Sequence, residues 1–279
     1  MKKATILALA ICASVAAVSP VSATVVDWSL VKFRNYLQTE NNALPATPTS
    51  FEIFSQLAVD NPGDFSSVAL GGVAGGPMPF HTEDGGFDWE LEENFPDQAA
   101  LDAAMSGPMN VTIDATIAGL GTIREPIEGL GDFPELRPVF TGAVYEALQS
   151  YNPAEEITLA WNDPSLSQEN LNEVFLYIDE VTPSGSQEVF YADGLTSTTS
   201  LVVPANTVEA GKNYVVVLAF AKSRRGARES FAAGEEIVAE GNQVGVEFSP
   251  VLVPEPATFG LLGIVATAML PWRRLRRLA

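Results

Sequence analysis

Apolar and polar residues alternate in short segments along most of this chain, and Gly, Pro, Asn and Asp separate one segment from the next. A period of two places successive side chains on opposite faces of the backbone, which is the pattern of a half-buried β-strand. Segments with the spacing of an amphipathic helix are scarce. In the C-terminal half, the pattern predicts strands at residues 136–141, 157–161, 174–179, 187–191, 200–203, 214–222 and 243–248. Seven strands in about 115 residues favour an antiparallel sandwich.

The N-terminal half is less regular, although it also favours strands over helices. Strands are predicted at residues 51–59, 66–73, 87–91 and 111–117, the first two joined through Asn61-Pro62-Gly63. Asp97 is expected to cap a short helix over residues 98–105, which Gly107 and Pro108 end. We interpret this half as a second β-sandwich or jelly-roll-like domain. The Gly-, Pro- and Glu-rich stretch from Arg124 to Glu135 is the predicted boundary between the two domains.

Two aromatic residues of the C-terminal half suggest a particular kind of sandwich. The strand count and the placement of Trp161 and Tyr214 resemble those of a fibronectin type III or immunoglobulin-like sandwich without its disulfide. Val203-Pro204, a turn and then Gly211-Lys212-Asn213-Tyr214 resemble the approach to a tyrosine corner in such modules. The predicted fold class is therefore mainly β. It comprises two antiparallel β-sandwich-like domains, over residues 24–130 and 131–250.

The C-terminal tail has a pattern of its own. Pro254-Glu255-Pro256 is expected to stay extended, because each proline disfavours helix in the residue before it. Residues 257–272 then form an uncharged, apolar run, which as a helix spans roughly 24 Å, slightly less than the ~30 Å hydrocarbon core of a membrane. The positive-inside rule keeps the following arginines in the cytoplasm. These are Arg273, Arg274, Arg276 and Arg277.

Val253-Pro254-Glu255-Pro256, the short apolar span and the arginine cluster resemble, in that order, the PEP-CTERM sorting signal of Gram-negative bacteria. The same segment is also catalogued as an ice-binding-protein C-terminal domain, a label that does not imply ice binding. The resemblance assigns residues 251–279 to the sorting signal, with a transmembrane segment at residues 257–272. It implies recognition by exosortase, a membrane-embedded processing enzyme, and release to the cell surface or to extracellular polysaccharide. The alternative is a plain membrane anchor with a chance Pro-Glu-Pro.

The N-terminus also indicates export. Lys2 and Lys3 precede an apolar stretch from Ala4 to Val18, and small residues favour cleavage after Ala23. Residues 1–23 are therefore a predicted secretory signal peptide, to be handled by the Sec translocon and signal peptidase. The only cysteine, Cys12, lies in this segment. Thiol chemistry and cysteine-ligated metals are thus excluded for the exported body, whose stability must come from a hydrophobic core.

The exported body is strongly acidic. Setting aside two lysines of the signal peptide, four arginines of the tail and Glu255 leaves nine basic and 34 acidic residues, a formal net charge of −25. Nucleic acid is excluded as a partner, because neutralising phosphates needs cationic patches. Solubility outside the cell is the simplest explanation, and binding of divalent cations or of a cationic partner is the alternative.

A basic cluster follows the most β-prone segment. We interpret it as a hairpin tip or the guard of an edge strand, with an anion site as the alternative. It consists of Lys222, Arg224, Arg225 and Arg228.

Histidine chemistry is limited to one residue, His81, which lies in a predicted loop. A single histidine excludes His-rich metal sites and HExxH hydrolases, and no G-x-S-x-G motif accompanies it. We therefore assign no catalytic residue.

The densest group of candidate ligands is acidic. It comprises Glu83, Asp84, Asp88, Glu90, Glu92, Glu93 and Asp97. Glu83, Asp84 and Asp88 are weak candidates for a calcium site, although their spacing is not that of an EF-hand. Paired carboxylates with Trp89 as a sugar platform are a second reading, that of a glycosidase. The third reading is a solvated loop and an alternating strand, in which Phe87, Trp89 and Leu91 face inward.

These observations predict an exported, non-enzymatic structural or adhesive protein of the cell surface or of the polysaccharide matrix. It would be anchored transiently in the membrane with its C-terminus in the cytoplasm, and it needs no cofactor apart from the weak calcium candidate. The alternative is a carbohydrate-binding protein with a platform of exposed aromatics, and a glycoside-active enzyme is a remote third. A row of exposed aromatic rings would favour sugar binding, whereas two carboxylates about 5 to 9 Å apart in a cleft would favour hydrolysis.

Overall fold

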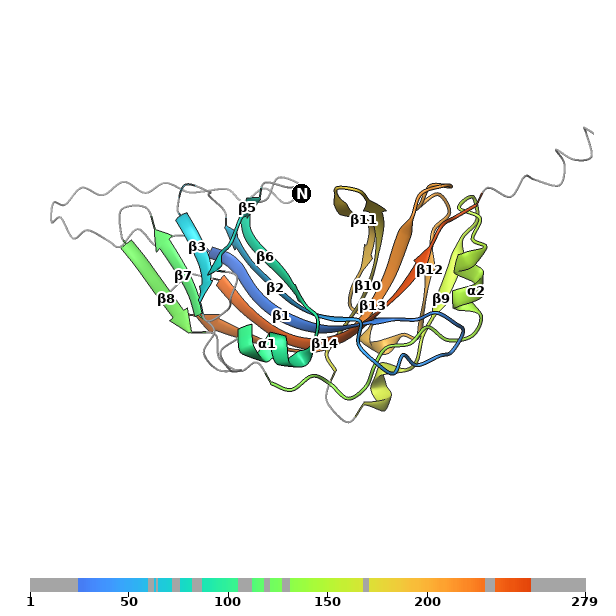
Figure 1. Cartoon of the computed structure of the whole chain (residues 1–279), viewed down its shortest axis with the longest axis horizontal. Helices are drawn as coiled ribbons and strands as arrows, with labels where there is room; N and C mark the ends of the chain where they lie inside the picture. The colour runs from blue at the N-terminus through green and yellow to red at the C-terminus, as the bar shows by residue number, and fades with distance from the viewer. Residues whose placement is uncertain are drawn as a thin grey trace, which may run out of the picture.

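The structure is a computed structural model that describes residues 25–59, 63, 65–71, 76–81, 87–104, 112–117, 121–126, 131–167, 171–228 and 234–251. It is mainly β, with one long curled sheet and a smaller layer at each end (Figure 1). Within the described part of the chain, no helix is long and apolar enough to cross a membrane. The predicted signal peptide, residues 1–23, lies outside the described residues. The functional residues predicted for the sorting tail, Val253 to Arg277, also lie outside them, so both segments stay predictions.

Eight strands form the main sheet. In spatial order they are β11 (Gly185–Ala192), β10 (Glu173–Thr182), β13 (Tyr214–Arg228), β14 (Gly234–Phe248), β1 (Val25–Leu37), β2 (Ser50–Val59), β6 (Phe87–Phe95) and β5 (Phe80–His81). Neighbouring strands are antiparallel except for β1 and β14, which run parallel over eleven paired positions. The predicted antiparallel arrangement is therefore wrong at this one pair. A parallel pair needs a long crossover connection, and nearly the whole chain provides it here.

Two smaller layers pack against the outer, convex side of the main sheet (Figure 1). Near the N-terminal strands, this layer is a four-stranded sheet with a short helix, α1 (Gln98–Ala104). Its strands are β4 (Gly76–Pro77), β3 (Phe65–Gly71), β7 (Thr112–Ile117) and β8 (Gly121–Pro126). Near the C-terminal strands, the layer is the pair β12 (Ser200–Val203) and β9 (Ile157–Ala160), with helix α2 (Val144–Gln149) and the 3-10 turns η2 (Pro164–Leu166) and η3 (Leu195–Ser197).

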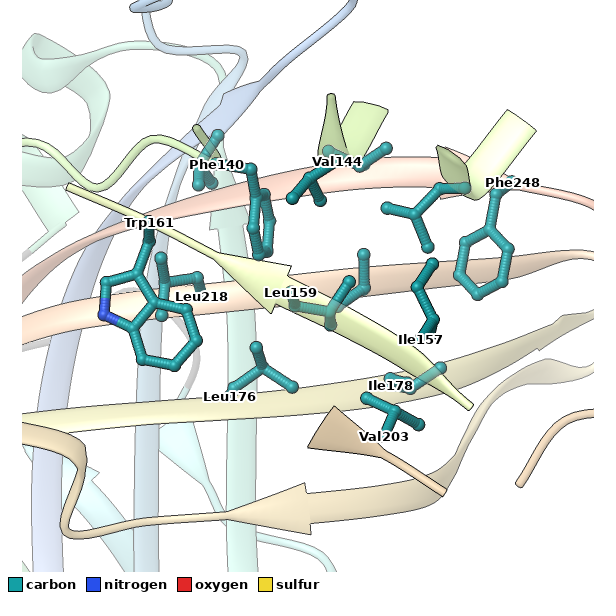
Figure 2. Close-up of a cluster of buried hydrophobic side chains, with 14 of the residues drawn as sticks. Phe140, Val144, Ile157, Leu159, Trp161, Leu176, Ile178, Val203, Leu218 and Phe248 are labelled. Atoms are coloured by element: carbon teal, nitrogen blue, oxygen red, sulfur yellow. The ribbon is translucent and has the colours of Figure 1, made fainter. Parts of the chain in front are cut away.

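The C-terminal core lies between β9 and β12 on one side and β10, β13 and β14 on the other. Figure 2 shows Leu159 of β9 facing Leu176 of β10 and Leu218 of β13, all of which are fully buried. Strands β11-β10-β13-β14 opposite β12-β9 form the two layers of a fibronectin-like sandwich. Tyr214 opens β13, and its hydroxyl accepts a hydrogen bond of 2.9 Å from the backbone N–H of Glu209. This contact is a tyrosine corner, so the feature predicted at Tyr214 is confirmed.

The N-terminal core follows from strict alternation in β2. Phe51, Ile53, Ser55 and Leu57 are buried, whereas the alternate residues of the strand are only half-buried. Helix α1 covers this core with Leu101, and the Asp97 carboxylate accepts a hydrogen bond of 2.8 Å from the N–H of Ala100. The predicted helix cap is therefore confirmed. Two hydrophobic cores thus exist, but they share one sheet, and the division into domains at residue 130 stays a prediction.

Several predicted elements differ from those observed. The strand predicted at residues 136–141 is only an isolated bridge between Phe140 and Trp161. Strands β1, β4, β5 and β8 and helix α2 were not predicted. Strands β13 and β14 are also longer than expected, each spanning 15 residues. Their common extension carries the sheet beyond the C-terminal sandwich and joins it to the N-terminal strands.

A close contact marks the centre of the junction between the two halves. Phe33 of β1 is in register with Gly241 of β14, and both lie on the concave face. A Cβ atom built on Gly241 would lie 2.3 Å from Cε1 of Phe33 and 3.0 Å from Cβ of Ala221. The Phe33 ring therefore occupies the space that a side chain at residue 241 would need. Glycine is required here for packing rather than for an unusual backbone angle.

We expect Gly241→Ala to lower the free energy of unfolding by about 1–3 kcal/mol, because the added methyl group must displace the Phe33 ring or separate β1 from β14. Chemical denaturation would measure this loss. Gly245→Ala is the matched control in the same strand, since its nearest atom is the flexible tip of Val215 at 3.2 Å, and its loss should be smaller. In a Phe33→Leu background the cost of Gly241→Ala should fall, and equal costs in both backgrounds would contradict the steric explanation.

Candidate functional site

The concave face of the main sheet carries a groove of about 570 Å³, between strands β10 and β11 at one end of the sheet and β2 and β6 at the other. Its floor is formed by the residues of β13 and β14 that point away from the two cores. Three of those side chains are small, whereas the alternate residues Val216, Leu218 and Phe220 are large and buried in the C-terminal core. The small floor residues are Ala221 and Ser223 on β13 and Ala239 on β14, and Arg225, Ile237 and Gln243 complete the lining from these strands. The same alternation therefore fills a core on one face and leaves a hollow on the other.

Aromatic side chains stand on both sides of this floor. Phe175 of β10 is the centre of the group, and its ring centroid lies 6.3 Å from those of Tyr177 and Tyr191 and 5.9 Å from that of Phe33. Phe54 of β2 lines the opposite wall. Tyr191 is the most accessible of these rings, with 51% of its surface exposed. The groove therefore offers aromatic faces to a ligand.

A polar network crosses the floor from β10 to β2. The side-chain amide of Gln243 donates hydrogen bonds to Asn35 Oδ1 at 2.8 Å and to Glu52 Oε2 at 3.1 Å. Asn35 also donates to Glu52 Oε2, at 3.1 Å, and the Tyr177 hydroxyl lies 3.5 Å from Gln243 Oε1. Burial raises the pKa of Glu52, although the two amide donors act in the opposite direction. The network fixes the Glu52 carboxylate at the edge of the groove.

Carboxylates dominate the charge of the groove. Those that line it are Glu52, Glu90, Glu173, Asp179 and Glu188. The guanidinium of Arg225 is the one cation among the described residues that line the groove, and it forms an ion pair with Glu173 at 3.0 Å. Glu173 also accepts a hydrogen bond of 2.9 Å from the Ser223 hydroxyl. The potential in the groove is therefore negative.

Asp179 and Glu188 are like charges placed side by side. They are in register on the neighbouring strands β10 and β11, an arrangement that is destabilising in a sheet. Burial and the charge of Glu188 raise the pKa of Asp179 to about 6, and a hydrogen bond from Ser186 opposes this effect only in part. Glu92 of β6 also faces Asp179 across the groove and acts in the same direction as Glu188. The carboxylates of Asp179 and Glu188 therefore repel each other.

Of the three calcium candidates, Asp88 alone lies within the described residues. Glu83 and Asp84 lie outside the described residues. Asp88 is on β6, where its carboxylate accepts a hydrogen bond of 2.6 Å from the side chain of Gln56. No group of three or more Asp, Glu, His or Cys side chains is placed to hold a metal ion within the described ranges. Of the acidic stretch singled out in the sequence, Glu90 is the residue that lines the groove.

The proposed sugar platform at Trp89 lies on the other face of the sheet. Trp89 packs against the N-terminal core and against Phe80, with ring centroids 5.1 Å apart. It cannot act together with Asp88 and Glu90, because successive side chains of a strand point to opposite faces. The combination of Trp89 with these two carboxylates is therefore wrong, and a glycosidase activity stays untested. The alternating interpretation is confirmed at Leu91, which is buried, and at Glu92, which is exposed.

The basic cluster lies at an edge. Strands β10 and β13 are paired only as far as Glu173 and Ala221, and beyond this point β13 pairs with β14 alone in the described part of the chain. Arg224 forms an ion pair of 3.5 Å with the buried Glu240, as Arg225 does with Glu173. The edge-strand interpretation is therefore confirmed for this cluster.

The groove itself was missed in the sequence, although a signal was present. In β10, the core residues Val174, Leu176 and Ile178 alternate with Glu173, Phe175, Tyr177 and Asp179. A strand face that contacts only solvent is usually polar, so two neighbouring aromatic residues on the face opposite the core indicate a second function for that face. Their partners Phe33 and Phe54 come from β1 and β2, which only the parallel β1–β14 pair brings to this place.

Comparison with known proteins gives limited information. No protein-family model matches the chain, and no curated protein matches it. Similar solved structures include fibronectin(III)-like modules of CbhA from Clostridium thermocellum (9% identity, 80% of this chain, 94% of that chain, TM-score 0.23). Others are the FN1–FN3 domains of chicken CNTN1 (9%, 81%, 66%, 0.25) and trypsin-activated alpha-2-macroglobulin from Escherichia coli (11%, 79%, 15%, 0.22). At these TM-scores the alignments establish no shared fold, and the fibronectin-like character of the C-terminal half rests on its strand order and its tyrosine corner.

The position of Asp179 leads to a pH dependence of stability. Its pKa is raised from the ordinary 3.8 to about 6, so the folded protein holds a proton that the unfolded chain has lost between these values. The contribution of Asp179 to stability therefore falls as the pH rises from about 4 to about 7. We expect Asp179→Asn to stabilise the protein by about 1 kcal/mol near neutral pH, allowing for solvent screening, and by little near pH 4.

Urea denaturation of both proteins across this pH range measures the difference. Asp193→Asn, an exposed aspartate just beyond β11, controls for the loss of one negative charge. A difference between Asp179→Asn and the wild type that stayed constant, or shrank, with rising pH would contradict the assignment.

Proposed function

We propose that this protein is an exported, non-enzymatic adhesive protein of the cell surface or extracellular matrix, and that its concave groove binds polysaccharide. The export signals at the two termini support the location. The groove supports the binding activity, because it joins aromatic faces to a row of hydrogen-bonding side chains in a hollow of the size common for small-ligand sites.

The chemistry of a sugar chain fits these two parts of the groove. A pyranose ring has apolar C–H faces that pack on aromatic rings such as Tyr191 and Phe175, and hydroxyl groups at its rim. Carboxylates and side-chain amides such as Glu52 and Gln243 can accept from or donate to these hydroxyls. The floor lies on the face of the sheet and opens along it, so a chain can lie in the groove without threading through a closed cavity. The aromatic row around Phe175 is the observation that carries the proposal.

Glycan binding is tested with Tyr191→Ala. Removal of the most exposed ring should weaken binding to the preferred glycan of a polysaccharide array by roughly ten-fold, as expected for an aromatic anchor in a binding site. Isothermal titration with the best array ligand measures this change on the full-length protein.

Phe80→Ala is the matched control for this experiment. Phe80 is 40% exposed and packs against Trp89, on the face opposite the groove, so its removal should leave glycan affinity unchanged. Equal losses for the two variants, or the absence of any bound glycan on the array, would refute binding through the groove.

Processing of the tail gives a separate prediction. In a host with exosortase, the exported protein should have a mass that lacks the cluster Arg273, Arg274, Arg276 and Arg277, and in a host without this enzyme it should keep the cluster. Intact-mass spectrometry measures both products. If the arginines remain in both hosts, the tail is a plain anchor.

A further inference from the structure

We infer that the groove selects sugar chains that carry free amino groups, that is, de-N-acetylated hexosamine polymers. This inference rests on the proposed polysaccharide binding and adds the charge of the ligand. It depends on three features of the groove, which are its excess of carboxylates, the like-charge pair between β10 and β11, and the aromatic faces beside them.

The groove has more carboxylates than the binding of a neutral sugar requires. Five carboxylates line the groove against a single guanidinium in its described lining, and that guanidinium already pairs with Glu173. Hydroxyl groups can be bound by uncharged amides, which cost less to desolvate than a carboxylate does. A positively charged ligand instead regains the desolvation cost through charge-assisted hydrogen bonds. Charge complementarity therefore points to a cation.

The pair Asp179–Glu188 indicates where one positive charge would lie. These carboxylates repel each other, and an ammonium group between them would attract both. Tyr191 and Glu188 are both on β11 and both line the groove, so a ring stacked on Tyr191 has this acidic pair nearby. A third carboxylate, that of Glu52 on β2, lines the same groove.

Aromatic faces favour the same ligand. A cation positioned over a phenol or phenyl ring is attracted by the negative face of the ring. Phe175 is surrounded by Phe33, Tyr177 and Tyr191 within 6.3 Å, so several such faces are available beside the carboxylates. An amino sugar presents both a C–H face for stacking and an ammonium group for these two kinds of attraction.

A basic peptide fits the groove less well than an amino sugar. Peptides bind to sheets mainly at an edge, where their backbone groups continue the hydrogen-bond ladder. The floor of this groove is the face of β13, β14 and β1. Strands β14 and β1 are paired on both sides over the floor, and β13 is paired on both sides as far as Ala221, beyond which the Asn172 side chain binds the backbone of Ser223. A peptide backbone lying there would find side chains alone as partners.

The test compares oligomers of glucosamine with free amines and oligomers of N-acetylglucosamine of the same length, by isothermal titration with the full-length protein. At a mildly acidic pH at which the amines are charged, the free-amine oligomer should bind at least roughly ten-fold more tightly, the size expected for one charge-assisted hydrogen bond. Added salt should reduce this preference, because it screens the charges.

Two variants identify the groove as the source of the preference. Glu188→Gln and Glu52→Gln should each weaken binding of the free-amine oligomer by a larger factor than binding of the acetylated oligomer, and so reduce the preference between the two. Glu146→Gln removes the same charge from the exposed surface of α2, outside the groove, and should have no effect. A thermal melt of each variant verifies that it is folded.

Each result decides between the two proposals. Equal affinity for both oligomers overturns the amino-sugar inference and leaves polysaccharide binding standing. If neither oligomer binds but the array yields another glycan, the inference fails alone, and if no glycan binds at all, both proposals fail. Polylysine that competes as tightly as the free-amine oligomer, and does so equally in Tyr191→Ala, would show general attraction of cations and would also overturn the inference.

Discussion

The use of one sheet for two hydrophobic cores is the constraint on which the rest of the structure depends. The convex face of the main sheet must carry large apolar side chains over each core, and β13 and β14 do so over the C-terminal core with residues such as Leu218, Phe220 and Val244. Both covering layers lie on that side, so the concave face has no covering layer, and its side chains must pack and form hydrogen bonds with one another. This face has small side chains at the centre, where Phe33 packs on Gly241, and polar and aromatic side chains at the walls. The hollow at the centre of this face is thus a consequence of how the sheet is shared.

The long hairpin of β13 and β14 determines how the two halves are connected. Because both strands continue past the end of the C-terminal sandwich, they offer a free edge on which β1 can pair, and β2 and β6 then follow by antiparallel additions. The buried amides of the floor bridge this junction, since Gln243 of β14 binds Asn35 of β1 and Glu52 of β2. These amides help to specify the register of the paired strands, because a shift by one residue would place them in the core on the opposite face.

Local pattern predicted much of this fold, and long-range pairing explains what it could not predict. The alternation in β2, β9, β10 and β12, the helix cap at Asp97 and the corner at Tyr214 all depend on neighbours close in sequence, and all were correctly anticipated. Strand β1 reads as an ordinary β-prone segment next to a signal peptide, and nothing within it specifies a partner some 208 residues away, the separation of Asn35 and Gln243. The candidate site could not be assembled for the same reason. Its aromatic and acidic residues come from β1, β2, β6, β10 and β11, and every element except β10 carries only one or two of them.

The parallel pairing of β1 with β14 also determines the order in which the protein can fold. The first described strand has its partner in the last, so the main sheet cannot close until almost all of residues 25–248 are available for pairing. Closure of so long a loop makes this step slow compared with the local hairpins. The C-terminal sandwich can form earlier from its own strands, and it would then serve as the template on which β1 docks. Until then the edge of β14 is exposed to other chains, so correct pairing of β1 with this edge is in competition with aggregation.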